Sequence, residues 1–147
     1  MVGLPNQTNE DLVNDLRYVK ELEPDMCGIG PFIPHKDTPL RDFTAGTTEK
    51  TVILLAITRL LLPKVLLPAT TALASIDANG RNEGLRAGAN LIMPNLSPMS
   101  VRKKYSLYNN KAFILDEDAE YRKSIEQKLN EAGFEIEFGR RDNPDWR

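Results

Sequence analysis

The chain has 147 residues, of which 41% are hydrophobic and 27% charged, and its formal net charge is −2. This length suits one domain with a sizeable core, and the charge excludes an extended basic surface for nucleic acid. The longest apolar run, residues 52–62, is too short to cross a bilayer, so we expect a cytoplasmic protein without a membrane partner.

The sequence offers few metal-binding side chains, because it has one cysteine, Cys27, and one histidine, His35. An iron–sulfur cluster needs about three or four thiolates, and a structural zinc site needs about four Cys or His ligands. We therefore expect neither a metal site nor a catalytic residue from this chain alone. Cys27 lies among apolar residues and is expected to be an inert buried thiol. His35 lies in a proline-rich stretch and is expected in a turn.

The N-terminal residues predict a strand end followed by an amphipathic helix. Residues 1–4 are mostly apolar, and Thr8 is a candidate N-cap with Asp11 three residues later, close to a capping box. Apolar residues recur at helical spacing over residues 9–22, and Pro24 follows.

The rest of the first two thirds alternates between short apolar strands and helices. Strands are expected at 25–30, 68–73 and 90–93, and helices at 48–62 and 81–88. The order β-α-β-α-β-α-β favours a parallel sheet. The prolines concentrate in the strand-to-helix links, which lie on the face where parallel α/β proteins build their sites.

The last third has a different character. A short strand at 113–115, a charged helix over 118–132 ending at Gly133, and a strand over 134–138 are the expected elements. The chain thus divides into residues 1–111 and a C-terminal extension, 112–147.

Several strings, taken in order, resemble one known family. They are MVGLPNQTNEDLVNDL (1–16), GIGPFIPHKDTPL (28–40), PATTAL (68–73), GLRAGANLIMPN (84–95) and YSLYNNK (105–111). Their order and spacing resemble the C-terminal half of radical S-adenosylmethionine (SAM) maturases of iron–iron hydrogenase, the HydE type. Biotin synthase and methylornithine synthase are similar relatives.

This resemblance implies an α/β fold, a partial TIM-like barrel of about four βα units plus a small α/β tail. In the intact family protein, a CxxxCxxC loop in the N-terminal half holds a 4Fe–4S cluster that binds SAM, and reductive cleavage of SAM gives a 5′-deoxyadenosyl radical. The present sequence has no such loop. We therefore expect a fragment that needs an N-terminal half-barrel, self-associates, or is unstable alone.

The resemblance also implies site residues, matched motif by motif. Thr70, Thr71, Met93 and Tyr105 match positions that line the substrate cavity, while Ile33 and Met1 match positions beside SAM. Several have a simpler explanation: threonine favours strands, methionine fills cores, and Met1 is the expected initiating residue. Adjacent threonines also cannot both face the interior of a regular strand.

Three functions remain open from the sequence. The chain is expected to belong to a radical SAM enzyme of hydrogenase cofactor maturation, acting on a small-molecule or metallocofactor-precursor substrate together with other maturation proteins. Alternatively, it is a non-enzymatic half-barrel remnant or partner subunit. A third possibility keeps the fold but serves methylornithine or biotin-type radical chemistry.

Overall fold

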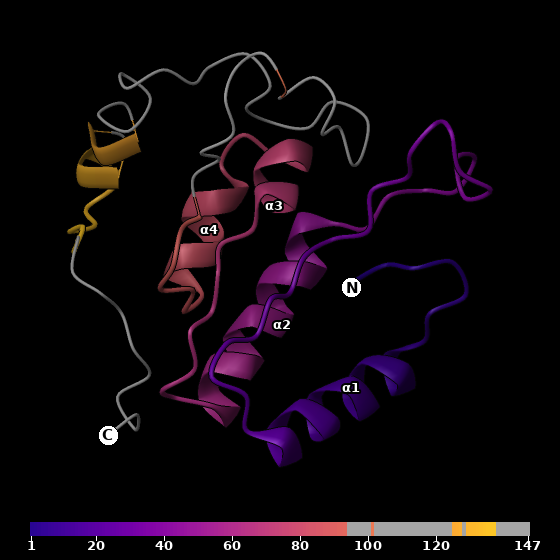
Figure 1. Cartoon of the computed structure of the whole chain (residues 1–147), viewed down its shortest axis with the longest axis horizontal. Helices are drawn as coiled ribbons and strands as arrows, with labels where there is room; N and C mark the ends of the chain where they lie inside the picture. Colours follow the sequence, from indigo (N-terminus) through magenta and orange to yellow (C-terminus); the bar gives the residue numbers. More distant parts are fainter. Residues whose placement is uncertain (94–100, 102–124, 128, 138–147) are drawn as a thin grey trace.

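The computed structural model describes residues 1–93, 101, 125–127 and 129–137. Figure 1 shows its labelled helices, which are α1 (Asn9–Leu22), α2 (Thr48–Leu61), α3 (Thr71–Ile76) and α4 (Gly80–Arg86). Tyr105 and the strand predicted at 113–115 lie outside the described residues. Among the helices described, none is long and apolar enough to span a membrane.

Extended segments before and between the helices pair in parallel. Isolated bridges join them in chain order: Val2 with Pro31, Met26 with Leu66, and Pro68 with Leu91. Main-chain hydrogen bonds flank the bridges, for example from Val2 N–H to the Gly30 carbonyl (3.0 Å) and from Ala69 N–H to the Leu91 carbonyl (2.9 Å). Within the described residues the pairing stays at isolated bridges and does not extend into continuous strands.

Helix α1 begins at the capping box that the sequence predicted. The Thr8 hydroxyl accepts a hydrogen bond from Asp11 N–H (3.1 Å), and the Asp11 carboxylate accepts one from Thr8 N–H (2.7 Å). Leu12 is buried and packs with Val2, and the helix ends where Glu23 adopts a left-handed conformation (φ 47°). The predicted range of 9–22 is confirmed.

Helix α2 buries a face that includes two threonines. Thr51 and Thr58 are 0% and 1% exposed. Their hydroxyls donate to the carbonyls of Thr47 and Leu54, each at 2.8 Å, so no polar atom is left unsatisfied there. The helix ends one residue before the predicted end at 62.

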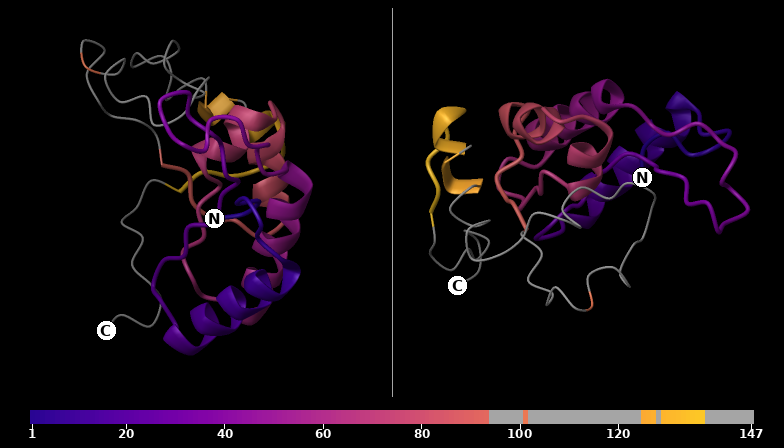
Figure 2. Two further views of the ribbon diagram at one scale, coloured as in Figure 1. Left: turned by 90° about the vertical axis from the view of Figure 1, so that its right-hand side faces the viewer. Right: turned by 90° about the horizontal axis from the view of Figure 1, so that it is seen from above.

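The core lies between the helices, which Figure 2 shows from two further sides, and one face of the paired segments. Cys27 and Ile29 pack against Leu55, Val65 and Leu67 in one cluster, while Val2 packs with residues of α1 and α2 in a second. Because side chains alternate along an extended segment, residues of the other parity face away from the helices.

The strand predicted over 68–73 is wrong in its second half. Pro68 and Ala69 are extended and pair with Leu91, but Thr71–Ile76 is helix α3. A short apolar run does not distinguish a buried strand from a buried helix, and alanine and leucine favour helix. Burial of Leu73, which is 0% exposed, in the helix-side core favoured the helix.

Of the remaining predicted elements, two helices agree with the structure and one strand does not. Helix α4 starts one residue before the predicted start at 81. Residues 125–127 and 129–131 are helical, and Gly133 follows with φ +84°, which confirms the predicted stop of the C-terminal helix. The strand predicted at 134–138 is not formed over residues 134–137, the part of it that is described.

Arg59 ties the end of α2 to the turn that follows it. Its guanidinium donates to the carbonyls of Pro63 (2.7 Å), Gly88 (2.8 Å), Val65 (2.9 Å) and Leu62 (3.3 Å). A cation at a helix C-terminus is favourable, and here it also satisfies carbonyls that the helix leaves open. These hydrogen bonds from Arg59 fix the position at which the extended segment 65–69 begins.

Candidate functional site

The face of the paired segments that points away from the helices is uncharged. We call it the open face and define it by the residues whose parity opposes that of Val2, Cys27 and Val65. These residues are Met1, Met26, Gly28, Gly30, Leu66, Pro68, Leu91 and Met93, and Pro68 is the one of them that is fully buried. Met1, Met26 and Met93 are 65%, 46% and 55% exposed, so this face presents thioethers and glycine backbone without a charged group.

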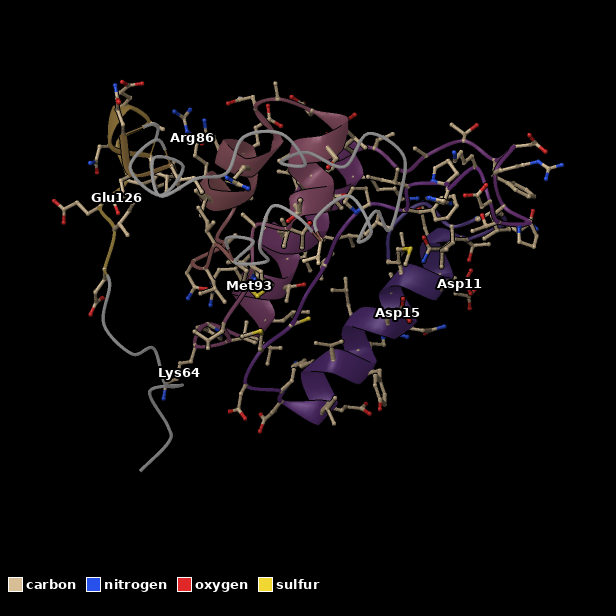
Figure 3. All side chains as sticks on the ribbon, turned by 45° about the horizontal axis from the view of Figure 1, so that its top comes forward. Asp11, Asp15, Lys64, Arg86, Met93 and Glu126 are labelled. Atoms are coloured by element: carbon tan, nitrogen blue, oxygen red, sulfur yellow. The ribbon has the colours of Figure 1, made fainter. Side chains whose placement is uncertain are left out.

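The register brings several predicted site residues to one level of this face. Val2 pairs with Pro31, which sets Met1 beside Gly30. Met26 pairs with Leu66 and Pro68 pairs with Leu91, so Thr70 follows at the level of Gly30, and Met93 at the level of Thr70. We call Met1, Gly30, Thr70 and Met93 the upper layer; Figure 3 labels Met93 within the molecule.

Gly30 and Thr70 lie close together within the upper layer. A Cβ built on Gly30 would lie 2.9 Å from the Thr70 hydroxyl oxygen and 3.6 Å from the Ala72 Cβ. The Thr70 hydroxyl is buried and has no hydrogen-bond partner within the described residues, although Thr70 is the N-cap of α3. A buried hydroxyl without a partner is costly, and its oxygen is the polar side-chain atom that this layer offers to a ligand.

The other predicted site residues that the structure describes, Thr71 and Ile33, lie outside the upper layer. Thr71 is the first residue of α3 and is half-buried, so the rule that a regular strand separates neighbouring side chains does not apply to the threonine pair. Ile33 is half-buried and opens the loop that returns at Gly46, whose N–H donates to the Phe32 carbonyl at 2.8 Å. The binding roles of all these residues stay predictions.

His35 is a turn residue, as expected. Its carbonyl accepts hydrogen bonds from the backbone and the hydroxyl of Thr38, at 3.1 and 2.8 Å, and its ring Nδ1 accepts one from Asp37 N–H at 3.2 Å. These bonds hold the imidazole against its own loop.

The donor set of the chain does not fit an iron–sulfur cluster. Cys27 is the single thiol of the sequence, and it packs on the helix side of the segments with Leu55 and Leu67. Burial raises the pKa of the Cys27 thiol, which disfavours the thiolate that a metal requires. Among the described residues, no three His, Cys, Asp or Glu side chains are grouped for a metal ion.

The open face fits SAM better than it fits a cluster. A Cβ on Gly28 would meet no atom within 4 Å, so the backbone there is open to a ligand. An uncharged wall of thioethers and glycines can pack against an adenosyl group and does not repel a sulfonium cation. Met1, Gly28 and Gly30 are the residues of this face that would hold it, and Ile33 is a further residue that the resemblance implies.

A cavity of about 150 Å³ lies between α1, α2 and the first two extended segments. Most of its lining comes from the helix side, including Leu12, Ile29 and Leu54. Met1 and Gly28 of the open face also line it, so the cavity reaches the edge of the predicted site.

Gly30 is a residue of the upper layer that the sequence motifs did not single out. Taken alone, Gly28 and Gly30 form only an incomplete fragment of a dinucleotide-binding motif and so indicate no site. The spacing of two between these glycines could have indicated it, because glycines at alternate positions of an extended segment leave one of its faces without side chains.

Comparisons with known proteins agree with the motifs. The chain is 51% identical over 118 residues to the FeFe hydrogenase maturase subunit HydE of Thermotoga maritima, a match that covers 80% of this chain and 34% of that protein. It is 32% and 30% identical to the 3-methylornithine synthases of Methanosarcina acetivorans and Methanosarcina barkeri, over 92% and 91% of this chain. No family model matches the chain.

The chain spans only about a third of the length of these curated relatives, 34% of the first and 37% of the other two. The predicted resemblance is confirmed by the identity, which extends over most of the chain. This sequence is therefore a homologue of one segment of the radical SAM maturases of the HydE type.

Proposed function

We propose that the chain supplies the SAM-facing and substrate-facing part of a radical SAM enzyme of hydrogenase cofactor maturation. The observation that carries the proposal is the 51% identity to a HydE subunit over 118 residues. The proposed architecture is four βα units of a TIM-like barrel, supported by parallel pairing in chain order and by the helices on one face of the segments.

In this proposal the open face is the inner wall of the barrel. Its methionines are exposed, and the space next to Gly28 is open. Both features are expected if the opposite wall of the barrel is formed by residues outside this chain. Those residues, an N-terminal half-barrel, would also supply the cluster thiolates, because this chain offers a single protonated thiol. The protein would act in the cytoplasm, with other maturation proteins as partners.

The chain's own residues would position the reactants. SAM, when bound to a reduced cluster, supplies the radical that starts the chemistry. Met1 and Ile33 would pack against the adenosyl group, while Met93 and Tyr105 would border the substrate. The Thr70 and Thr71 hydroxyls would donate to a carboxylate or another polar group of the substrate. An apolar wall excludes water and so strengthens the hydrogen bonds that position the substrate.

The test combines the purified chain with a separately expressed N-terminal segment of the Thermotoga HydE protein. After anaerobic reconstitution and reduction, we expect 5′-deoxyadenosine from SAM in the mixture, and neither iron absorbance nor SAM cleavage from the 147-residue chain alone. Cleavage by the chain alone, or an inert mixture in which both parts are folded, would contradict the proposal. An inert mixture would favour a non-enzymatic partner subunit.

Thr70→Val in that mixture should lower the rate of substrate turnover about tenfold, because one hydrogen bond to a ligand contributes about 1–1.5 kcal/mol. Thr70→Ser keeps the hydroxyl and should retain most of the activity. If both variants behave like the unmodified chain, the hydroxyl does not touch the substrate.

The similarity to methylornithine synthases supports a second candidate function, radical chemistry of the methylornithine type. This function differs from the first in its substrate and has the same fold. Assays for methylornithine formation and for turnover of hydrogenase precursors separate the two, because a methylornithine-type enzyme yields its amino-acid product without any hydrogenase component.

A further inference from the structure

The side-chain amide of Gln7 joins two main-chain groups at the end of the first extended segment. Its Oε1 accepts a hydrogen bond from Gly3 N–H at 2.7 Å and a longer one from Leu4 N–H at 3.3 Å, and its Nε2 donates to the Met1 carbonyl at 3.0 Å. The partners fix the orientation of the amide, because a main-chain N–H only donates and a carbonyl only accepts. Gln7 therefore uses both its donor and its acceptor on one short stretch of backbone.

A tight turn between Leu4 and Gln7 directs this side chain back onto the segment. The Gln7 N–H donates to the Leu4 carbonyl at 3.1 Å, and between them lie Pro5 and Asn6, the latter with φ 62°. Proline at the second position and a positive φ at the third are typical of a type II turn, in which asparagine is tolerated. Four consecutive residues thus determine where the Gln7 amide lies.

The Gln7 amide occupies the place of a residue of a neighbouring parallel strand. On one side of the first segment, the N–H and the carbonyl of Val2 bond to the second segment, at 3.0 and 2.7 Å. On the other side, the Met1 carbonyl and the Gly3 N–H are the pair that one residue of a parallel neighbour would bridge. Gln7 bridges this pair instead, so each of the two peptide groups beside Val2 is held at both ends.

We propose that Gln7 is a positioning residue for SAM, because its bond to the Met1 carbonyl holds Met1 in the upper layer. This inference rests on the proposed function, in which Met1 packs against the adenosyl group. The Met1 side chain lies beside Gly30 and is 65% exposed, so packing holds it weakly and its place depends on its main chain. Without the Gln7 bond, that main chain has to be ordered when the ligand binds, which lowers affinity.

Binding of S-adenosylhomocysteine to the chain mixed with the N-terminal HydE segment tests this. The sulfur of this probe is neutral, so a new carboxylate does not attract it as it would attract a sulfonium. Gln7→Ala should weaken binding about fivefold, the contribution of one hydrogen bond. Gln7→Glu should weaken it as much, because a carboxylate accepts from Gly3 N–H but cannot donate to the Met1 carbonyl. In SAM cleavage, both variants should raise KM and leave kcat unchanged.

Hydrogen exchange in the chain alone separates the two contacts of Gln7. The Gly3 N–H should exchange faster in Gln7→Ala, which removes its acceptor, and should stay protected in Gln7→Glu. Gln127→Ala is the control, since Gln127 is an exposed glutamine bonded to Glu131 in the C-terminal helix, and it should leave affinity and exchange unchanged.

Two outcomes overturn the positioning role of Gln7. One is an affinity that neither substitution of Gln7 lowers. The other is a Gln7→Glu variant that binds as tightly as the unmodified chain while Gln7→Ala binds weakly, because Gln7 then acts only on the turn. An unmodified mixture that binds no S-adenosylhomocysteine contradicts the proposed function itself, and this inference falls with it.

Discussion

Two glycines with positive φ, Gly88 and Gly133, differ in how much room their surroundings leave for a side chain. Gly88 has φ +113°, and a Cβ there would lie 2.7 Å from the Cβ and Cγ of Arg59. Gly133 has φ +84°, and a Cβ there would meet nothing within 4 Å. An L residue is strained at both positions. Only at Gly88 would the added Cβ also clash with Arg59, the side chain that holds the end of α2 in place.

Gly88→Ala should therefore destabilise the protein by about 3 kcal/mol or more, through backbone strain together with overpacking against Arg59. Gly133→Ala should cost about 1–2 kcal/mol, the strain of a left-handed residue alone. Urea denaturation followed by circular dichroism measures both changes. Equal losses at the two positions would show that the contact with Arg59 carries no energy.

At the scale of an element, α1 depends on a capping box that titrates. The Thr8 backbone N–H, and then its hydroxyl, hold the pKa of Asp11 below its ordinary value. Because the folded pKa is the lower one, the carboxylate stabilises α1 above the unfolded pKa, near 3.8, and this stabilisation is lost as pH falls through the folded pKa.

Asp11→Asn should lower the melting temperature at neutral pH, and the difference from the unmodified chain should shrink as the pH falls below about 4. Asp15→Asn is the control on the same helix, because Asp15 lies outside the capping box; Figure 3 labels both residues. A difference that stays constant with pH would show that the cap acts through packing and not through charge.

The last extended segment is joined to its neighbour partly by a side chain. Asn90 Oδ1 accepts a hydrogen bond from Leu67 N–H at 2.8 Å, and Asn90 N–H donates to the Leu67 carbonyl at 2.9 Å. The amide side chain thus takes the place of a main-chain acceptor next to a residue that is 0% exposed.

Asn90→Ala should cost about 1–3 kcal/mol, because the Leu67 N–H is left without a partner in a buried site. Asn90→Asp keeps an acceptor oxygen and should cost less at neutral pH. Chemical denaturation measures both variants. An alanine variant as stable as the unmodified chain would mean that water replaces the side chain.

At the scale of the whole molecule, the reactivity of Cys27 reports the packing of the helical layer. The thiol is half-buried, and the burial that raises its pKa comes from packing against Leu55, Leu67 and their neighbours. At mildly alkaline pH, a thiol reagent should therefore modify Cys27 much more slowly in the folded chain than in urea. Equal rates in the two conditions would show that the helices do not close over the segments.

The sequence by itself determined the local elements and the family. Capping chemistry at Thr8, helical spacing over 9–22 and 48–62, and the glycine after the C-terminal helix each set a boundary through contacts a few residues apart. The motifs identified the relatives because they span most of the chain.

Only the tertiary structure decided which residues share a face. It turned Thr71–Ile76 into α3, because burying Leu73 in the helix-side core outweighs a weak strand preference. It also set Gly30 beside Thr70 and turned the apolar side of α2 outward. These outcomes depend on register and packing between segments far apart in the chain, which local spacing does not specify.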